Sequence, residues 1–190
     1  MSWLPNAITL LRVLLVIPTA MLLWRGEYNW ALVLMIAAGV SDGLDGYLAR
    51  RYNWFSQFGA VVDPLADKFL VATMLLVFAL QDYFPWWFLA IIVLRDALIF
   101  TGGVIYLLLF GPFEMAPSLL SKANTAAQIV VVVIAIVALC DFGELSQFCQ
   151  QVVTPWGIWI LAVLGIASGV HYVSVWGYRT MTQLRERRLS

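Results

Sequence analysis

Four aspartates stand close together between positions 42 and 67 of a chain that is otherwise mostly apolar. An ionised carboxylate at the centre of a membrane helix costs about 2.5–3.5 kcal/mol on insertion scales. Four carboxylates at short range also repel one another, so the set requires a neutralising cation. A divalent metal ion with oxygen ligands meets this requirement. The carboxylates are Asp42, Asp45, Asp63 and Asp67.

The spacing of these residues distributes them over two helices. Asp42, Asp45 and Ala49 stand at i, i+3 and i+7, and therefore share one helical face. Asp63 and Asp67 stand at i and i+4, one turn apart on a second helix. Two helices that each present a pair of carboxylates can enclose one or two hard cations.

An ion or proton transporter is an alternative from a different class of protein, because intramembrane carboxylates often serve as proton relays or ion sites. A transporter would need a polar path that continues towards the outer side of the membrane. The later hydrophobic segments contain almost no polar residues on that side. The lack of such a path argues against a transporter.

The stretch that carries the aspartates reads D-G-L-D-G-Y-L-A-R, then eight residues, then G-A-V-V-D-P-L-A-D. It resembles the signature of the CDP-alcohol phosphotransferases, which is D-x-x-D-G-x-x-A-R followed after a short gap by G-x-x-x-D-x-x-x-D. All eight defining positions match. The resemblance implies a membrane enzyme that uses Mg²⁺ or Mn²⁺ to transfer the phosphatidyl group of CDP-diacylglycerol to an alcohol. It also implies release of CMP and a homodimer.

The resemblance further implies roles for the aspartates. Asp67, the last in the array, would be the general base that deprotonates the acceptor hydroxyl. Asp42, Asp45 and Asp63 would be metal ligands, and Asp67 would be able to contact a metal too. The cation would bridge the pyrophosphate of the CDP-lipid, stabilise charge on the transferring phosphorus and ease the departure of CMP.

The expected CDP-lipid site surrounds these carboxylates. Gly46 and Gly59 would let the nucleotide approach the helix backbones closely, because glycine has no side chain. Arg50 would offer a planar fork to phosphate or cytidine. Ser56 would donate to a phosphate, or would merely begin the next helix. The complete expected set is Asn6, Thr9, Asp42, Gly46, Ala49, Arg50, Ser56 and Gly59.

Cations expected on the same side of the membrane suit an acceptor that bears a phosphate. The expected acceptor-binding residues are Arg12, Lys68, Arg95 and Lys122. Simpler interpretations stay open, because Arg12 and Lys122 also fit long side chains that extend to the interface. Arg95 with Asp96 also fits a buried charge pair. His171 is interpreted as a packed or interfacial histidine rather than a catalyst.

The composition predicts an all-α, polytopic membrane protein. At 63% apolar and 12% charged residues, the chain is not a soluble globular domain. Its formal charge is zero and no basic run is long enough for nucleic acid. Six segments are long enough to cross about 30 Å of hydrocarbon as helices. We place them near 6–24, 30–51, 58–81, 86–110, 118–140 and 155–180.

These segments predict a bundle of six transmembrane helices that forms a single domain over residues 1–190. Pro5, Pro85 and Pro155 each fit the start of a helix. Residues 1–5 carry no basic region, so we expect the first hydrophobic segment to remain as an anchor. A disulfide between Cys140 and Cys149 is left open.

Basic residues predict the orientation of the bundle. They concentrate between the second and third segments, between the fourth and fifth, and at the C-terminus, whereas the opposite connections are mostly acidic. We therefore expect both termini and the aspartates to face the cytoplasm. The polar site would lie at the cytoplasmic end of the second and third helices, in a bacterial inner membrane.

Two later segments bear on the identity of the acceptor alcohol. The stretch P-S-L-L-S-K-A-N-T-A-A-Q resembles the P-x-x-x-S-K-x-N-T-x-x-Q of eukaryotic-type cardiolipin synthases within the same family. Phosphatidylglycerophosphate synthases usually carry R-E-I followed later by L-R-E-W; this chain has V-L-R-D-A-L-I and lacks the second motif. The resemblance thus favours phosphatidylglycerol as acceptor, with glycerol 3-phosphate as the runner-up.

Overall fold

The structure, a computed structural model, describes the backbone of residues 3–52, 57–110 and 118–189. Within these ranges it describes the side chains of residues 14–41, 43, 51, 68–109, 118–177 and 181. Every regular element in the described ranges is helical, which confirms the all-α prediction. The elements are α1 (Trp3–Trp24), α2 (Tyr28–Tyr52), α3 (Gln57–Leu80), α4 (Trp86–Phe110), α5 (Leu119–Leu139), α6 (Glu144–Gln151), a π-helical segment (Val152–Gly157) and α7 (Ile158–Leu189).

The first five helices match the predicted segments to within a few residues, and the last begins at Ile158, near the predicted 155, but continues to Leu189 rather than ending near 180. The short helix α6 was not predicted, and Pro155 does not begin a helix. The chain is already helical at Glu144, and Pro155 lies inside the π-helical segment. Thr154 leaves helical geometry there, with φ −115° and ψ 100°. The short helix α6 is held to the end of α5 by Ser146, whose hydroxyl donates to the carbonyls of Val137 and Cys140.

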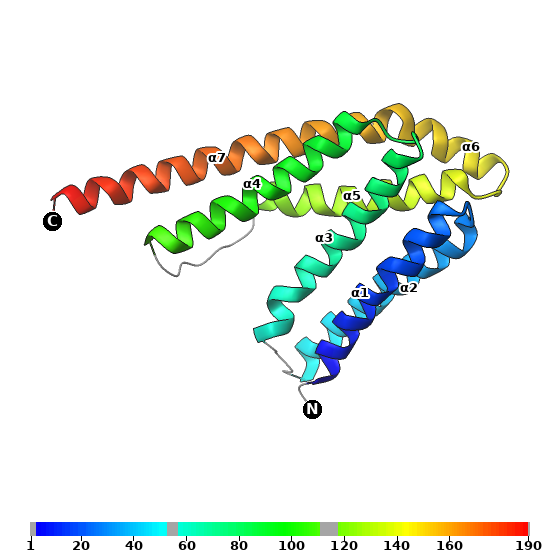
Figure 1. Cartoon of the computed structure of the whole chain (residues 1–190), viewed down its shortest axis with the longest axis horizontal. Coiled ribbons are helices and arrows are strands. Elements are labelled where there is room, and N and C mark those ends of the chain that lie inside the picture. The colour runs from blue at the N-terminus through cyan, green and yellow to red at the C-terminus, as the bar shows by residue number, and fades with distance from the viewer. Residues whose placement is uncertain (1–2, 53–56, 111–117, 190) are drawn as a thin grey trace.

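The turns α1–α2, α3–α4 and α5–α6 gather at one end of the molecule, as the alternating direction of the helices requires (Figure 1). Nε2 of Gln81, after α3, donates to the carbonyl of Trp24 at the end of α1 over 3.2 Å. The ring of Tyr83 packs against Phe78 and Phe84, with centroids 5.4 and 5.3 Å away, and these two rings also contact each other. The first contact joins the α3–α4 turn to the end of α1, and the aromatic rings pack at the α3–α4 turn.

Helix α5 connects two groups of helices. Helices α2 and α3 both pack against α1, while α4 packs along α7, and α5 contacts α2, α3 and α7 (Figure 1). The core contains large side chains from several helices, including Leu23, Phe78, Phe88, Ile136 and Leu161. Both cysteines are buried free thiols.

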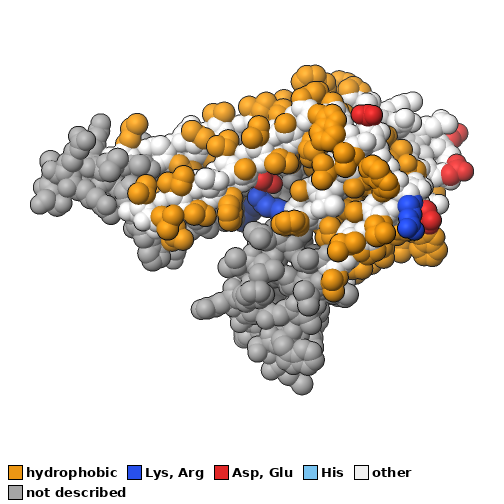
Figure 2. All heavy atoms as spheres, viewed as in Figure 1, with side chains coloured by type: hydrophobic (Ala, Val, Ile, Leu, Met, Phe, Trp, Pro, Cys, Tyr) orange, Lys and Arg blue, Asp and Glu red, His pale blue; other side chains and the backbone are white. Residues whose placement is uncertain are grey.

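The described part of the face shown in Figure 2 is mostly apolar. Charged side chains gather near the α1–α2 and α5–α6 turns, and a small charged group lies in the middle of the face shown. Exposed tryptophans near the turn end include Trp24, Trp30 and Trp156, as expected where rings meet a membrane interface. Three described stretches are long and apolar enough to cross a bilayer: Trp86–Leu109, Leu119–Leu139 and Glu144–Gly177.

Shorter apolar stretches lie at Leu14–Trp24, Tyr28–Ser41 and Lys68–Leu80. Together with the mostly apolar face in Figure 2, the long and short stretches indicate an integral membrane protein. A count of six crossings and the orientation in the membrane stay predictions.

Candidate active site

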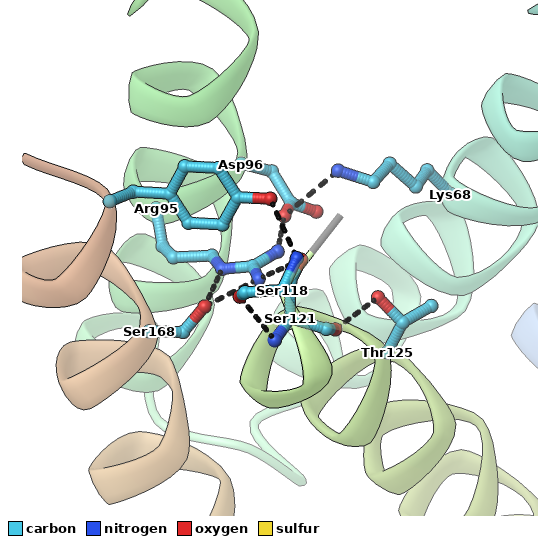
Figure 3. Close-up of polar contacts among 8 residues, drawn as sticks. Lys68, Arg95, Asp96, Ser118, Ser121, Thr125 and Ser168 are labelled. Atoms are coloured by element: carbon cyan, nitrogen blue, oxygen red, sulfur yellow. Dashed lines mark hydrogen bonds and ion pairs between the residues drawn. The ribbon is translucent and has the colours of Figure 1, made fainter. Parts of the chain in front are cut away.

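A buried arginine on α4 is the centre of the polar contacts in the described part of the chain (Figure 3). Arg95 is only 3% exposed. A guanidinium carries five N–H donors and cannot lose its charge, so burial requires several acceptors. Nε and Nη2 donate to Oγ of Ser168 on α7 over 3.2 and 2.6 Å, and Nη2 also donates to Oγ of Ser121 on α5 over 2.7 Å. Arg95 therefore joins three helices.

A single carboxylate binds two cations beside it. Oδ1 of Asp96 accepts from Nη1 of Arg95 and from Nζ of Lys68 on α3, the latter over 3.1 Å. The side chains of Lys68 and Asp96 are 36% and 24% exposed, so this pair lies nearer to solvent than Arg95 does. Among the residues whose side chains are described, two cations for one carboxylate leave one positive charge, which favours an anionic ligand.

The start of α5 lies beside the arginine. Oγ of Ser118 caps the helix by accepting from the backbone N–H of Ser121 over 3.2 Å. The backbone N–H of Ser118 donates to the hydroxyl of Tyr172 on α7 over 3.4 Å. Lys122, in the first turn of α5, is exposed. This cap fixes the first turn of α5, from which the hydroxyl of Ser121 accepts a hydrogen bond from Arg95.

Two glycines of α7 allow close approach to α4. A Cβ on Gly169 would lie 3.8 Å from Cγ of Arg95, and a Cβ on Gly165 would lie 3.3 Å from Cγ2 of Ile91. Small residues of this kind let membrane helices pack closely. Outside this contact, aliphatic side chains of both helices line a groove of about 400 Å³, which Arg95 and the two glycines also border.

The predicted acceptor residues are thus partly brought together. Lys68 and Arg95 meet through Asp96, so the anticipated Arg95–Asp96 pair is present and belongs to a larger network. His171 is exposed and its ring lies edge-on to Tyr172 at 6.4 Å.

The other predicted site residues lie outside the residues whose side chains the structure describes. They are Asn6, Thr9, Arg12, Asp42, Asp45, Gly46, Ala49, Arg50, Ser56, Gly59, Asp63 and Asp67. The helical spacing on which the metal prediction rests is present, because α2 continues through Asp42 and Asp45 and α3 through Asp63 and Asp67. Four carboxylates on two helices offer the oxygen ligands that Mg²⁺ and Mn²⁺ prefer.

Sequence reasoning missed Ser168 and Tyr172 as members of the network. Ser168 is fully buried among apolar residues of α7, and a lone serine in the run I-A-S-G-V is the signal that could have found it. Ser121 lies within the S-K-A-N-T stretch, but nothing in that stretch identifies Arg95 as its partner. Contacts between residues 26 and 73 positions apart depend on tertiary packing.

Residues 2–167 match the model of the CDP-alcohol phosphatidyltransferase family, and the chain belongs to that family. It is therefore a transferase of phospholipid synthesis, as the aspartate signature predicts. A CDP-diacylglycerol–glycerol-3-phosphate 3-phosphatidyltransferase of Bacillus subtilis is 32% identical, over 90% of this chain and 93% of its own. A putative cardiolipin synthase of Mycobacterium tuberculosis is 29% identical, over 96% and 88%. A probable CMP-forming cardiolipin synthase of Drosophila melanogaster is 31% identical, over 67% and 45%.

Proposed function

We propose that this enzyme transfers the phosphatidyl group of CDP-diacylglycerol to phosphatidylglycerol, forming cardiolipin and releasing CMP. The observation that carries the choice of a lipid acceptor is the groove between α4 and α7, which Arg95 borders. The contact of Lys68 with Asp96, next to buried Arg95, supports binding of an acceptor phosphate. Lys68 directly follows Asp67, the last residue of the family signature. The contact therefore supports binding of an acceptor phosphate near that end of the signature.

Each expected group has a distinct part in the reaction. Asp67 takes the proton of the acceptor hydroxyl, whose oxygen forms a new bond to the transferring phosphorus while the bond to CMP breaks. Lys68 and Arg95 hold the acceptor phosphate, and exposed Lys122 is available to do the same. Asp42, Asp45, Asp63 and Asp67 would hold Mg²⁺ or Mn²⁺, which supplies positive charge to the pyrophosphate and the leaving CMP.

The groove between α4 and α7 supports a lipid acceptor. Its lining includes the exposed side chains of Leu94, Leu98 and Val170, so it opens towards the surrounding lipid, and Arg95 borders it. A lipid acceptor must reach the site from the plane of the membrane because its acyl chains stay in the leaflet. Glycerol 3-phosphate needs only an opening to water.

Glycerol 3-phosphate remains the second candidate, because the relative from Bacillus subtilis named for that acceptor aligns over nearly its whole length. Both acceptors carry a phosphate and a glycerol hydroxyl, so the cations alone do not separate them. For either acceptor we propose one domain over residues 1–190, a homodimer, and a site that faces the cytoplasm in a bacterial inner membrane. The basic connections support that orientation.

A competition assay tests the acceptor. Purified protein in vesicles receives CDP-diacylglycerol, Mg²⁺ or Mn²⁺, and both acceptors together, and the lipid products are identified by mass. Cardiolipin is expected. Phosphatidylglycerophosphate alone would identify glycerol 3-phosphate as the acceptor and refute the first choice.

A further inference from the structure

Two carboxamides inside the bundle lack partners in the described part of the chain. Asn124 and Gln128, one turn apart on α5, are 1% and 3% exposed. Nδ2 and Oδ1 of Asn124 and Nε2 of Gln128 make no hydrogen bond there. Buried polar atoms are normally paired, and water is scarce in apolar surroundings. These three atoms therefore indicate a ligand that supplies both donors and acceptors.

The position of the pair connects it to the cationic network. Asn124 lies one turn beyond Ser121, which accepts from Arg95. Oδ1 of Asn124 lies 4.0 Å from where a Cβ of Gly165 would be, and Gly165 borders the same groove as Arg95. The two carboxamides thus continue the polar surface of α5 from the arginine into the bundle.

A neighbouring residue shows how a polar side chain on this helix is satisfied without a ligand. Oγ1 of Thr125 donates to the backbone carbonyl of Ser121 over 3.2 Å, within its own helix. The unpaired atoms of Asn124 and Gln128 make no such bond to their own helix in the described part of the chain. Asn124 and Gln128 instead need partners that come from outside α5.

We propose that Asn124 and Gln128 bind the secondary, non-reacting hydroxyl of the acceptor's glycerol. This inference rests on the proposed function and adds the residues that recognise the polyol part of the acceptor. A hydroxyl donates to a carboxamide oxygen and accepts from a carboxamide N–H, whereas a phosphate only accepts. The phosphate is matched by Arg95 and Lys68, so the two ends of the headgroup have separate partners.

The test compares acceptors that differ by this hydroxyl. One arm uses phosphatidylglycerol against phosphatidyl-1,3-propanediol, and the other uses glycerol 3-phosphate against 3-hydroxypropyl phosphate. The wild-type enzyme is expected to show a kcat/KM about tenfold lower for the acceptor that lacks the secondary hydroxyl, because its carboxamides then stay unpaired. The arm in which product forms shows whether the acceptor is phosphatidylglycerol or glycerol 3-phosphate.

Leucine variants complete the test. In Asn124→Leu and Gln128→Leu, the kcat/KM for the full acceptor falls to that for the deoxy acceptor, while the KM for CDP-diacylglycerol stays unchanged. Thr125→Val is the matched control on the same helix and keeps the wild-type discrimination. Thermal unfolding verifies folding, and Asn124→Ser replaces the leucine variant if that does not fold.

Three results would overturn the inference. Equal use of both acceptors by the wild type would mean that the pair binds only water. An equal loss of activity on both acceptors in the leucine variants would mean a purely structural role. No product from either full acceptor would overturn the proposed function and, with it, this inference.

Discussion

Asp96 neutralises two cations, and its replacement by asparagine tests how far the site depends on that charge. In Asp96→Asn the guanidinium of Arg95 stays buried, at 3% exposure, without its counterion. Removing one partner of a buried ion pair costs about 3–5 kcal/mol. Asp96 is 24% exposed and Arg95 keeps Ser121 and Ser168 as partners. We therefore expect a loss of about 2–3 kcal/mol in the free energy of unfolding.

Lys68→Gln is the matched control, because it breaks only the outer contact of the same carboxylate. Both side chains of that contact are partly exposed, at 36% and 24%, so the expected loss is about 0.5 kcal/mol. The double variant Arg95→Met/Asp96→Asn removes the buried charge of Arg95 and the partly exposed charge of Asp96. Its loss in the free energy of unfolding should be at least about 1 kcal/mol smaller than the sum of the losses in Arg95→Met and Asp96→Asn, because neither of the two charges is left unpaired.

Thermal unfolding in detergent, followed by tryptophan fluorescence, measures these differences. For a chain of this size 1 kcal/mol corresponds to about 2–4 °C in Tm, so Asp96→Asn should lower Tm by roughly 4–12 °C. Lys68→Gln should lower it by about 1–2 °C. Equal losses in Asp96→Asn and Lys68→Gln, or strict additivity in the double variant, would refute the importance of the buried charge pair.

Four further predictions concern the reaction and the turn end. Activity should require a divalent cation and should nearly vanish in the metal-ligand variants, so full turnover in chelator would contradict the metal site. Those variants are Asp42→Asn, Asp45→Asn and Asp63→Asn. Asp67→Asn should lose phosphatidyl-transfer activity but still bind CDP-diacylglycerol in an equilibrium assay, because a base acts chiefly in the transition state. A parallel loss of activity and of binding would mean that Asp67 is only a metal ligand. Lys122→Ala should raise the KM for the acceptor more than that for CDP-diacylglycerol, and equal rises would argue against acceptor binding. Burial, followed by charge on Cys149 and Tyr28, raises the pKa of Tyr83 above its usual value near 10, so stability should fall as the pH rises through that pKa. Tyr83→Phe should remove this alkaline loss of stability. It should also raise the free energy of unfolding by about 1 kcal/mol at neutral pH, because the buried hydroxyl has no partner among the described residues. An unchanged alkaline unfolding profile would contradict this prediction.

Long hydrophobic runs bounded by proline or charge explain why α1 to α5 could be predicted from the sequence. Helix α6 could not, because its eight residues are short and polar and are held by Ser146 to carbonyls of the preceding helix. The aspartate signature and the cations were evident as residue types. The partners of these residues could not be predicted, because a serine in α7 accepts a hydrogen bond from Arg95 only when α4 and α7 pack together.

The bonds of Arg95 also bear on how the protein is made. Ser121 and Ser168 follow Arg95 by 26 and 73 residues, so neither can contact it when Arg95 first leaves the ribosome. Only Asp96, its immediate neighbour, and Lys68, already synthesised, are present then. The newly inserted α4 must therefore carry a charged pair into the membrane with most of the guanidinium donors unsatisfied, which raises the cost of inserting it. The arrival of α7 supplies Ser168, so the last helix to be synthesised completes the coordination of a charge placed in the middle of the chain.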